Sequence, residues 1–335
     1  MIFPLAMSFF GGEPLYQMLL IAATLLTGIY NTLWKEPVTV LGGKRLIFLR
    51  SLFVLIFVLP YAFASGFSSF IIDISLESIS FLSLIAIFCL AYPGLYFFVK
   101  ATKSGPTTVV VPVASSFTIL LPVLVHVFFF KDWDFHHFSV AGFFLLVLGL
   151  LLLKFRFSSG KISYTGDAGF WYAFLSAILN GIVLAIADRI IPAVGSAVTL
   201  IVQEGSILIW SFFHILLSRY LGMRQKQKGN TRAFRWSSEQ LKHHWRTYAW
   251  IIGMIGALSG LSEVFRMISQ NAPQPMATFF MSFSALVTVI AAQIYYSEKL
   301  RPQQWLAVFF LIAGIFIISW IGDGQLRNMD ALLPG

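Results

Sequence analysis

Long apolar runs separated by short polar connections dominate this chain. A helix needs about 20 residues to cross the hydrocarbon core of a membrane, and ten runs approach that length. They are residues 16–33, 46–64, 81–99, 107–130, 138–153, 168–187, 197–217, 248–268, 276–296 and 305–321. None alternates apolar and polar residues as the strands of a membrane barrel do. The pattern therefore predicts an all-α polytopic membrane protein with ten transmembrane helices.

The end of the first half is repeated at the end of the second. Residues 103–106 are echoed by residues 270–273, 167 positions later, and each precedes an apolar run, a charged break and another apolar run. The same offset relates Lys131 to Glu298. Five helices per half is an odd number, so the halves enter the membrane from opposite sides. We expect two inverted five-helix repeats, residues 1–157 and 168–335, joined by a linker at 158–167.

The closing pattern of the second half carries a family resemblance. Residues 284–320 combine an apolar helix, the break Glu298-Lys299-Leu300 and a second helix containing Ala313-Gly314. This pattern resembles the drug/metabolite transporter superfamily, in particular its ten-helix EamA-like members. The first half departs from it, because Lys131 and Asp132 replace the expected Glu. The resemblance implies a secondary transporter, usually an exporter of a small metabolite such as an amino acid, working by alternating access.

Composition and charge agree with a membrane protein. Hydrophobic residues make up 58% of the chain and charged residues 11%, against about 25% charged residues in soluble domains. We expect an integral protein of the bacterial cytoplasmic membrane. The net charge of +9 comes from Lys and Arg in loops beside apolar runs, so lipid headgroups are the expected partner rather than nucleic acid. The longest basic loop, 222–247, is predicted to contain a short separate helix that begins at Ser238.

Charged residues inside apolar runs are candidates for function because their burial in lipid is costly. Glu204 and Glu263 could bind a proton or a substrate amine in a cavity. Alternatively, Glu204 pairs with Arg50 and Glu263 with Arg266, as structural ion pairs. The sequence leaves both interpretations open.

Other polar-capable residues lie within or at the ends of the runs and could line a cavity for a small-molecule solute. For Asn180 the alternative is a hydrogen bond that holds helices together. The predicted substrate-binding residues are Trp34, Tyr92, Tyr96, Asn180, Glu204, Glu263 and Ser282.

Several chemistries are not expected. The carboxylates and imidazoles in residues 132–137 fill a connection too short to fold around an ion, so we predict no metal. Residues 66–69 resemble a serine nucleophile motif, but no His and acid lie near them, so an enzyme is not expected. No nucleotide-binding motif occurs, so no cofactor is expected, and the energy for transport is expected to come from gradients or from the substrate itself.

Two other functions remain open. A carrier of phosphorylated or lipid-linked sugars would need a cationic cavity, for which Arg50, Lys100 and Arg266 are the candidates. A non-transporting membrane interaction or regulatory protein would use the basic loop. The oligomeric state is not determined by the sequence.

Overall fold

A computed structural model describes residues 13–64, 79–125, 128–129, 137–158, 161–164, 168–227, 238–268 and 274–322. Helices dominate these residues, so the helical character of the predicted runs is confirmed. The long helices are α2 (Glu13–Leu33), α4 (Gly43–Ala64), α6 (Ile79–Ser104), α7 (Thr107–Val125), α8 (His137–Lys154), α9 (Ala168–Val194), α10 (Ser196–Gln227), α11 (Ser238–Ile268), α12 (Gln274–Tyr296) and α13 (Pro302–Gly322). A short helix, α3 (Lys35–Leu41), follows α2.

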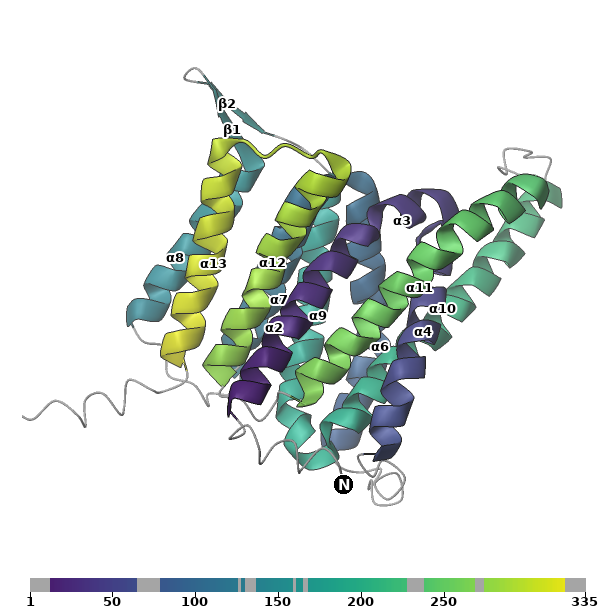
Figure 1. Ribbon diagram of the computed structural model, residues 1–335, viewed down its shortest axis with the longest axis horizontal. Coiled ribbons are helices and arrows are strands. Elements are labelled where there is room, and N and C mark those ends of the chain that lie inside the picture. Colours follow the sequence, from purple (N-terminus) through teal and green to yellow (C-terminus); the bar gives the residue numbers. More distant parts are fainter. Residues whose placement is uncertain are drawn as a thin grey trace, which may run out of the picture.

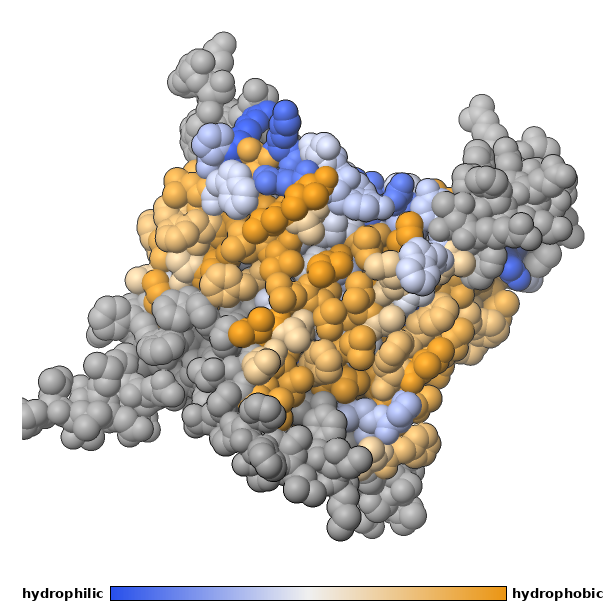
Figure 2. Space-filling model, in the orientation of Figure 1, coloured by the Kyte–Doolittle hydropathy of each residue, from blue (hydrophilic) through white to orange (hydrophobic). Residues whose placement is uncertain are grey.

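The helices lie side by side in a bundle (Figure 1). In the described part of the chain, five helices are long and apolar enough to cross a membrane: Gly43–Ala64, Phe81–Ser104, Ala168–Ile191, Ser196–Leu221 and Tyr248–Arg266. Hydrophobic residues cover the side shown in Figure 2, and hydrophilic residues gather at the end that carries α3. A soluble protein rarely exposes such a surface, so the structure supports a polytopic membrane protein. Ten crossings remain a prediction.

One short hairpin is added to the predicted all-α fold. Strand β1 (Phe155–Ser158) pairs antiparallel with β2 (Lys161–Tyr164), and Phe155 lies opposite Tyr164. The physical reason is visible in the sequence, because both segments alternate large apolar and polar residues with the period of a strand. This hairpin overlaps the predicted linker between the halves.

The predicted basic loop is also partly wrong. Helix α10 continues to Gln227, and α11 begins at Ser238 and runs unbroken to Ile268. Ser238 therefore starts a long helix and not a separate short one. Residues 223–227 and 239–247 contain no Gly or Pro, so nothing in them interrupts a helix. Residues 228–237 lie outside the described part, and contact of this region with lipid headgroups remains a prediction.

Each central helix packs between partners from the other half of the chain. Helix α6 packs against α9 and α10, α7 against α9 and α12, α2 against α11 and α12, α4 against α10 and α11, and α8 against α13 (Figure 1). Small residues permit close approach: a Cβ atom at Gly256 of α11 would lie 2.3 Å from the Cβ of Phe53 on α4. The bundle therefore brings side chains that are far apart in the sequence together around α10.

Candidate functional site

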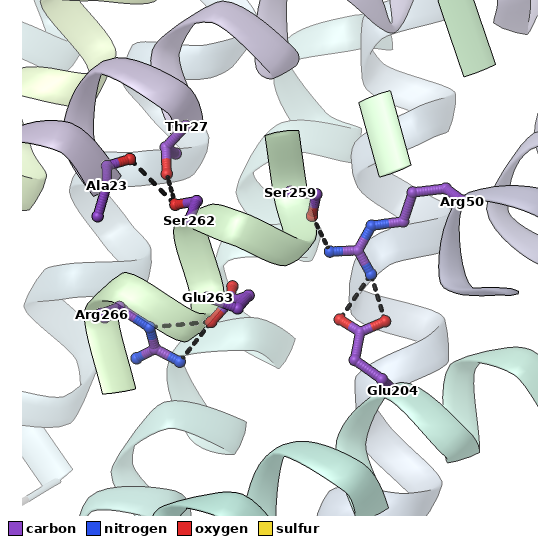
Figure 3. Close-up of polar contacts among 8 residues, drawn as sticks. All are labelled: Ala23, Thr27, Arg50, Glu204, Ser259, Ser262, Glu263 and Arg266. Carbon is purple, nitrogen blue, oxygen red and sulfur yellow. Dashed lines mark hydrogen bonds and ion pairs between the residues drawn. The ribbon is translucent and has the colours of Figure 1, made fainter. Parts of the chain in front are cut away.

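A buried ion pair and an adjoining hydrogen bond connect three helices of the bundle (Figure 3). The Arg50 guanidinium on α4 donates hydrogen bonds from Nη1 to both carboxylate oxygens of Glu204 on α10, at 2.6 Å to Oε1. Its Nη2 donates to the hydroxyl of Ser259 on α11. The Arg50 and Glu204 side chains are only 6% and 1% exposed. Both charges are thus neutralised inside the protein.

The neighbouring polar contacts belong to α11 (Figure 3). Arg266 Nε donates to Glu263 Oε2 at 3.0 Å, one turn along the same helix. The Ser262 hydroxyl donates to the carbonyl of Ala23 at 3.0 Å and lies 2.6 Å from the hydroxyl of Thr27, both on α2. The contacts of Ser262 join α11 to α2, and the carboxylates of Glu204 and Glu263 are each paired with an arginine.

A second polar group lies between α6 and α10. The Tyr92 hydroxyl is 2.5 Å from Nδ1 of His214, and the Tyr96 ring lies 5.0 Å from the His214 ring. One helical turn from each of Tyr92 and His214, Trp210 Nε1 donates to the carbonyl of Phe88 at 3.0 Å. Both hydrogen bonds join residues 122 positions apart, so α6 and α10 run parallel along an aromatic seam.

Two lysines lie at the end of this seam. Lys44, in the first turn of α4, donates to the hydroxyl of Ser218 on α10. Lys100 of α6 lies over the rings of Tyr96 and Tyr172, with Nζ 5.6 and 4.7 Å from their centroids. The two ammonium groups lie close enough to repel each other, and both lie close enough to the His214 ring to interact with it electrostatically. Among the described residues, no carboxylate forms an ion pair with either lysine.

An apolar groove of about 710 Å³ opens along the same seam. Its lining is Tyr92, Trp210, Phe213, His214, Leu216, Leu217 and Tyr220. Phe213 and Leu217 are about half exposed, so the groove faces the apolar flank of the bundle rather than its centre. Such a groove can hold a hydrocarbon chain at the boundary with lipid, while the Tyr92–His214 pair offers polar contacts at its base.

Two of the predicted substrate-binding residues lie at this groove. Tyr92 lines it, and Tyr96 stacks on Tyr92 with ring centroids 5.9 Å apart. Glu204 and Glu263 lie elsewhere, in the ion pairs that the alternative interpretation described.

The other predicted residues are also dispersed. Trp34 is buried between α2 and α3 with its ring edge-on to Phe98, and its indole N–H has no hydrogen-bond partner in the described part. Asn180 of α9 donates to Ser176 at 3.2 Å beside Gly94 of α6, in a helix contact. Ser282 belongs to α12, but its side chain lies outside the described residues. The six whose side chains the structure describes therefore do not line one cavity.

Sequence reasoning missed His214, Lys44 and Trp210. A signal was available: Tyr92, Tyr96 and Lys100 recur every four residues on α6, and Trp210, His214 and Ser218 do so on α10. Residues four apart share one face of a helix. Which faces would meet could not be deduced, because α6 and α10 belong to different halves.

The break that carries the family resemblance has a structural role. Glu298, in the connection between α12 and α13, pairs with Lys35 and accepts hydrogen bonds from the backbone N–H groups of Thr107 and Thr108, at 3.2 and 3.0 Å. Partial burial raises the pKa of this carboxyl, but the hydrogen bonds from Lys35, Thr108 and Thr107 outweigh it, and the net pKa is lowered. The carboxylate thus caps the start of α7 and ties it to α3.

Comparison with known proteins identifies relatives. No family model matches the chain. A probable 4-amino-4-deoxy-L-arabinose-phosphoundecaprenol flippase subunit ArnE of Yersinia pseudotuberculosis is 30% identical over 86 residues, which are 25% of this chain and 75% of the relative. The ArnE of Yersinia pestis is 29% identical over 86 residues, with the same shares of the two chains. The chain belongs to the ArnE family. The same 86 residues are a quarter of this chain but three quarters of the relative, so the ArnE subunits are about a third as long as this chain.

The fold is also known from a solved structure. One crystal structure of a protein, described without a function, has a TM-score of 0.56 and covers 95% of this chain and 99% of its own chain, at 14% sequence identity. At this identity the likeness concerns the fold alone. It covers nearly the whole helical bundle, well beyond the part matched by ArnE.

Proposed function

We propose that this protein is a membrane transporter of the flippase type that moves a lipid-linked sugar between the two faces of a bacterial cytoplasmic membrane. The observation that carries the proposal is the aromatic groove between α6 and α10, which is open toward the apolar flank of the bundle. A lipid-linked substrate keeps its hydrocarbon chain in the membrane while its polar part crosses, so its site must open sideways. The ArnE relatives, named as subunits of a lipid-linked-sugar flippase, support the same substrate class.

The proposal includes two inverted five-helix repeats within the drug/metabolite transporter superfamily. If α2, α4, α6, α7 and α8 correspond in order to α9–α13, exchanging the halves exchanges the observed contacts. The pair α6–α9 becomes α11–α2, α7–α9 becomes α12–α2, and α6–α10 becomes α11–α4. The pairs α4–α10 and α8–α13 each join corresponding helices. This interchange supports alternating access by movement of one half against the other.

An amino-acid exporter has less support. A carboxylate that is not already neutralised would favour binding of an amino acid's ammonium group, whereas Glu204 and Glu263 are each paired with an arginine. The groove offers mainly aromatic and aliphatic side chains. A lipid-linked sugar is therefore the better match, as the cationic residues Lys44 and Lys100 beside the groove also suggest.

Reconstitution tests the proposal directly. Purified protein in liposomes should move a fluorescent 4-amino-4-deoxy-L-arabinose-phosphoundecaprenol analogue between leaflets at least tenfold faster than protein-free liposomes, as measured by loss of fluorescence to an impermeant quencher. The same liposomes should not release loaded amino acids. Release of amino acids without lipid movement would overturn the proposal in favour of a metabolite exporter.

A further inference from the structure

We infer that Lys44, Lys100 and His214 form a phosphate site at the end of the aromatic groove, which binds a polyisoprenoid lipid phosphate with its hydrocarbon chain along Trp210 and Leu217. The inference rests on the proposed function for the choice of lipid. It adds the residues that recognise the anionic group, which neither the fold nor the ArnE relatives identify.

The first argument is charge. Lys44 reaches His214 through Ser218 and Lys100 reaches it through the Tyr96 ring. The two positive charges thus come from different helices and lie close enough to interact with each other and with His214. Like charges gathered without an acidic partner cost free energy unless an anion joins them. Neither lysine has a carboxylate partner in the part of the chain that the structure describes. The missing charge is therefore expected to come from a ligand.

The second argument is the local backbone. Helix α4 begins at Gly43, and its first turn carries no acidic residue. The positive end of the helix dipole thus coincides with Lys44, an arrangement that repels a cation and attracts an anion. A phosphate at this position would receive charge-assisted hydrogen bonds from lysine, which are stronger than bonds between neutral groups.

The third argument is the neighbouring groove. His214 lines the groove and is joined to Lys44 through Ser218, whose hydroxyl accepts from Lys44 and donates to the His214 carbonyl at 2.6 Å. Lys100 reaches the same place over Tyr96, whose ring contacts His214. The cationic end is therefore continuous with an apolar groove of about 710 Å³. A ligand with an anionic group joined to a hydrocarbon chain satisfies both parts, and a lipid phosphate, the class that the proposed function implies, is such a ligand.

Binding to the purified protein in detergent separates this inference from transport. Radiolabelled undecaprenyl phosphate should bind the wild type and bind Lys44→Gln/Lys100→Gln at least tenfold more weakly. Undecaprenol, which lacks the phosphate, should bind both proteins equally and weakly. Lys103→Gln and Arg45→Gln are matched controls, because these side chains are exposed on the same helices, and should bind as the wild type does. Leu217→Trp, which fills the groove, should weaken binding of both lipids.

Competition identifies the source of the phosphate. Phosphatidylglycerol and inorganic phosphate should each compete at least tenfold less well than undecaprenyl phosphate. Equal competition by phosphatidylglycerol would overturn the inference in favour of ordinary headgroup attraction, and full competition by inorganic phosphate would indicate a site for a soluble anion. Undiminished binding by the double variant, or by Lys100→Gln alone if the double variant does not fold, would also overturn it.

The proposed function can fail separately. If the wild type binds undecaprenyl phosphate through these lysines but moves no lipid-linked sugar, the phosphate site stands and the transport proposal falls. If lipid-linked sugar moves equally fast in the wild type and the double variant, transport stands and the phosphate site falls.

Discussion

Helix α10 takes part in two groups of charged residues that are built in opposite ways. Glu204 is paired with Arg50, and both are almost fully buried. Ten residues along the helix, about 15 Å, His214 lies beside Lys44 and Lys100, which have no acidic partner among the described residues. A charge removed from water needs a partner within the protein, whereas a charge near the surface is solvated and remains available to bind a ligand. We therefore expect the first group to stabilise the structure and the second to bind a ligand.

Breaking the balanced group should have the largest effect. Glu204→Gln leaves the buried Arg50 guanidinium without its counter-charge, so we expect the free energy of unfolding to fall by about 3–5 kcal/mol. Chemical unfolding in detergent, followed by circular dichroism, measures the loss. Ser259→Ala is the matched control, since it removes a single hydrogen bond from the same guanidinium and should cost about 1 kcal/mol.

The double variant Arg50→Gln/Glu204→Gln sharpens the same test. Removing both charges leaves no uncompensated ion, so its loss should be clearly smaller than the sum of the two single losses. If Glu204→Gln were as stable as the wild type, the Arg50–Glu204 pair would not hold the bundle together. The buried pair would then not be the structural group of the two.

Glu298 extends the comparison to a charge outside the membrane-spanning segments. Its lowered pKa means that its stabilising contribution is fully present above the ordinary glutamate pKa and is lost as pH falls through the lower folded-state value. Glu298→Gln should therefore lower the free energy of unfolding by about 1–2 kcal/mol at pH 7 and by much less at pH 3. Unfolding at both pH values measures this. A loss that is equal at both would mean that charge is not what ties the connection to α7.

The comparison also shows what the sequence could predict. Apolar runs of membrane-crossing length fix the helices, because no other element satisfies its own backbone in lipid. The pairs Arg50–Glu204 and Glu263–Arg266 could be anticipated, since an unpaired charge is so costly there. The pairing of β1 with β2 was missed because strands of four residues are short beside such long helical runs.

The groove could not be predicted, for a different reason. Its residues come from α6 and α10, and Lys44 joins from α4, so their meeting depends on how the two halves pack. Periodicity within α6 places Tyr92, Tyr96 and Lys100 on one face but does not say what that face contacts. The candidate residues were chosen for their polarity and their depth in the apolar runs alone, and in the structure they therefore lie in several separate contacts.

A smaller effect is expected from the pair on α11. Glu263 and Arg266 are about one-fifth exposed, so water screens part of their attraction, and the coupling should be about 0.5–1 kcal/mol. A double-mutant cycle with Glu263→Gln and Arg266→Gln measures it. A coupling as large as that between Arg50 and Glu204 would show that partial exposure does not separate structural from weakly held charges in this protein.

The smallest effect should have the opposite sign. Lys44→Gln keeps a hydrogen-bond donor for Ser218 but removes the repulsion between Lys44 and Lys100, so without ligand the protein should be as stable as the wild type or more stable by up to about 0.5 kcal/mol. High salt screens this repulsion and should remove the difference. Arg45→Gln, an exposed neighbour, should change nothing. If Lys44→Gln lowered the free energy of unfolding by more than about 1 kcal/mol, this lysine would be a structural residue. Removing a charge destabilises the ligand-free protein only where that charge stabilises it.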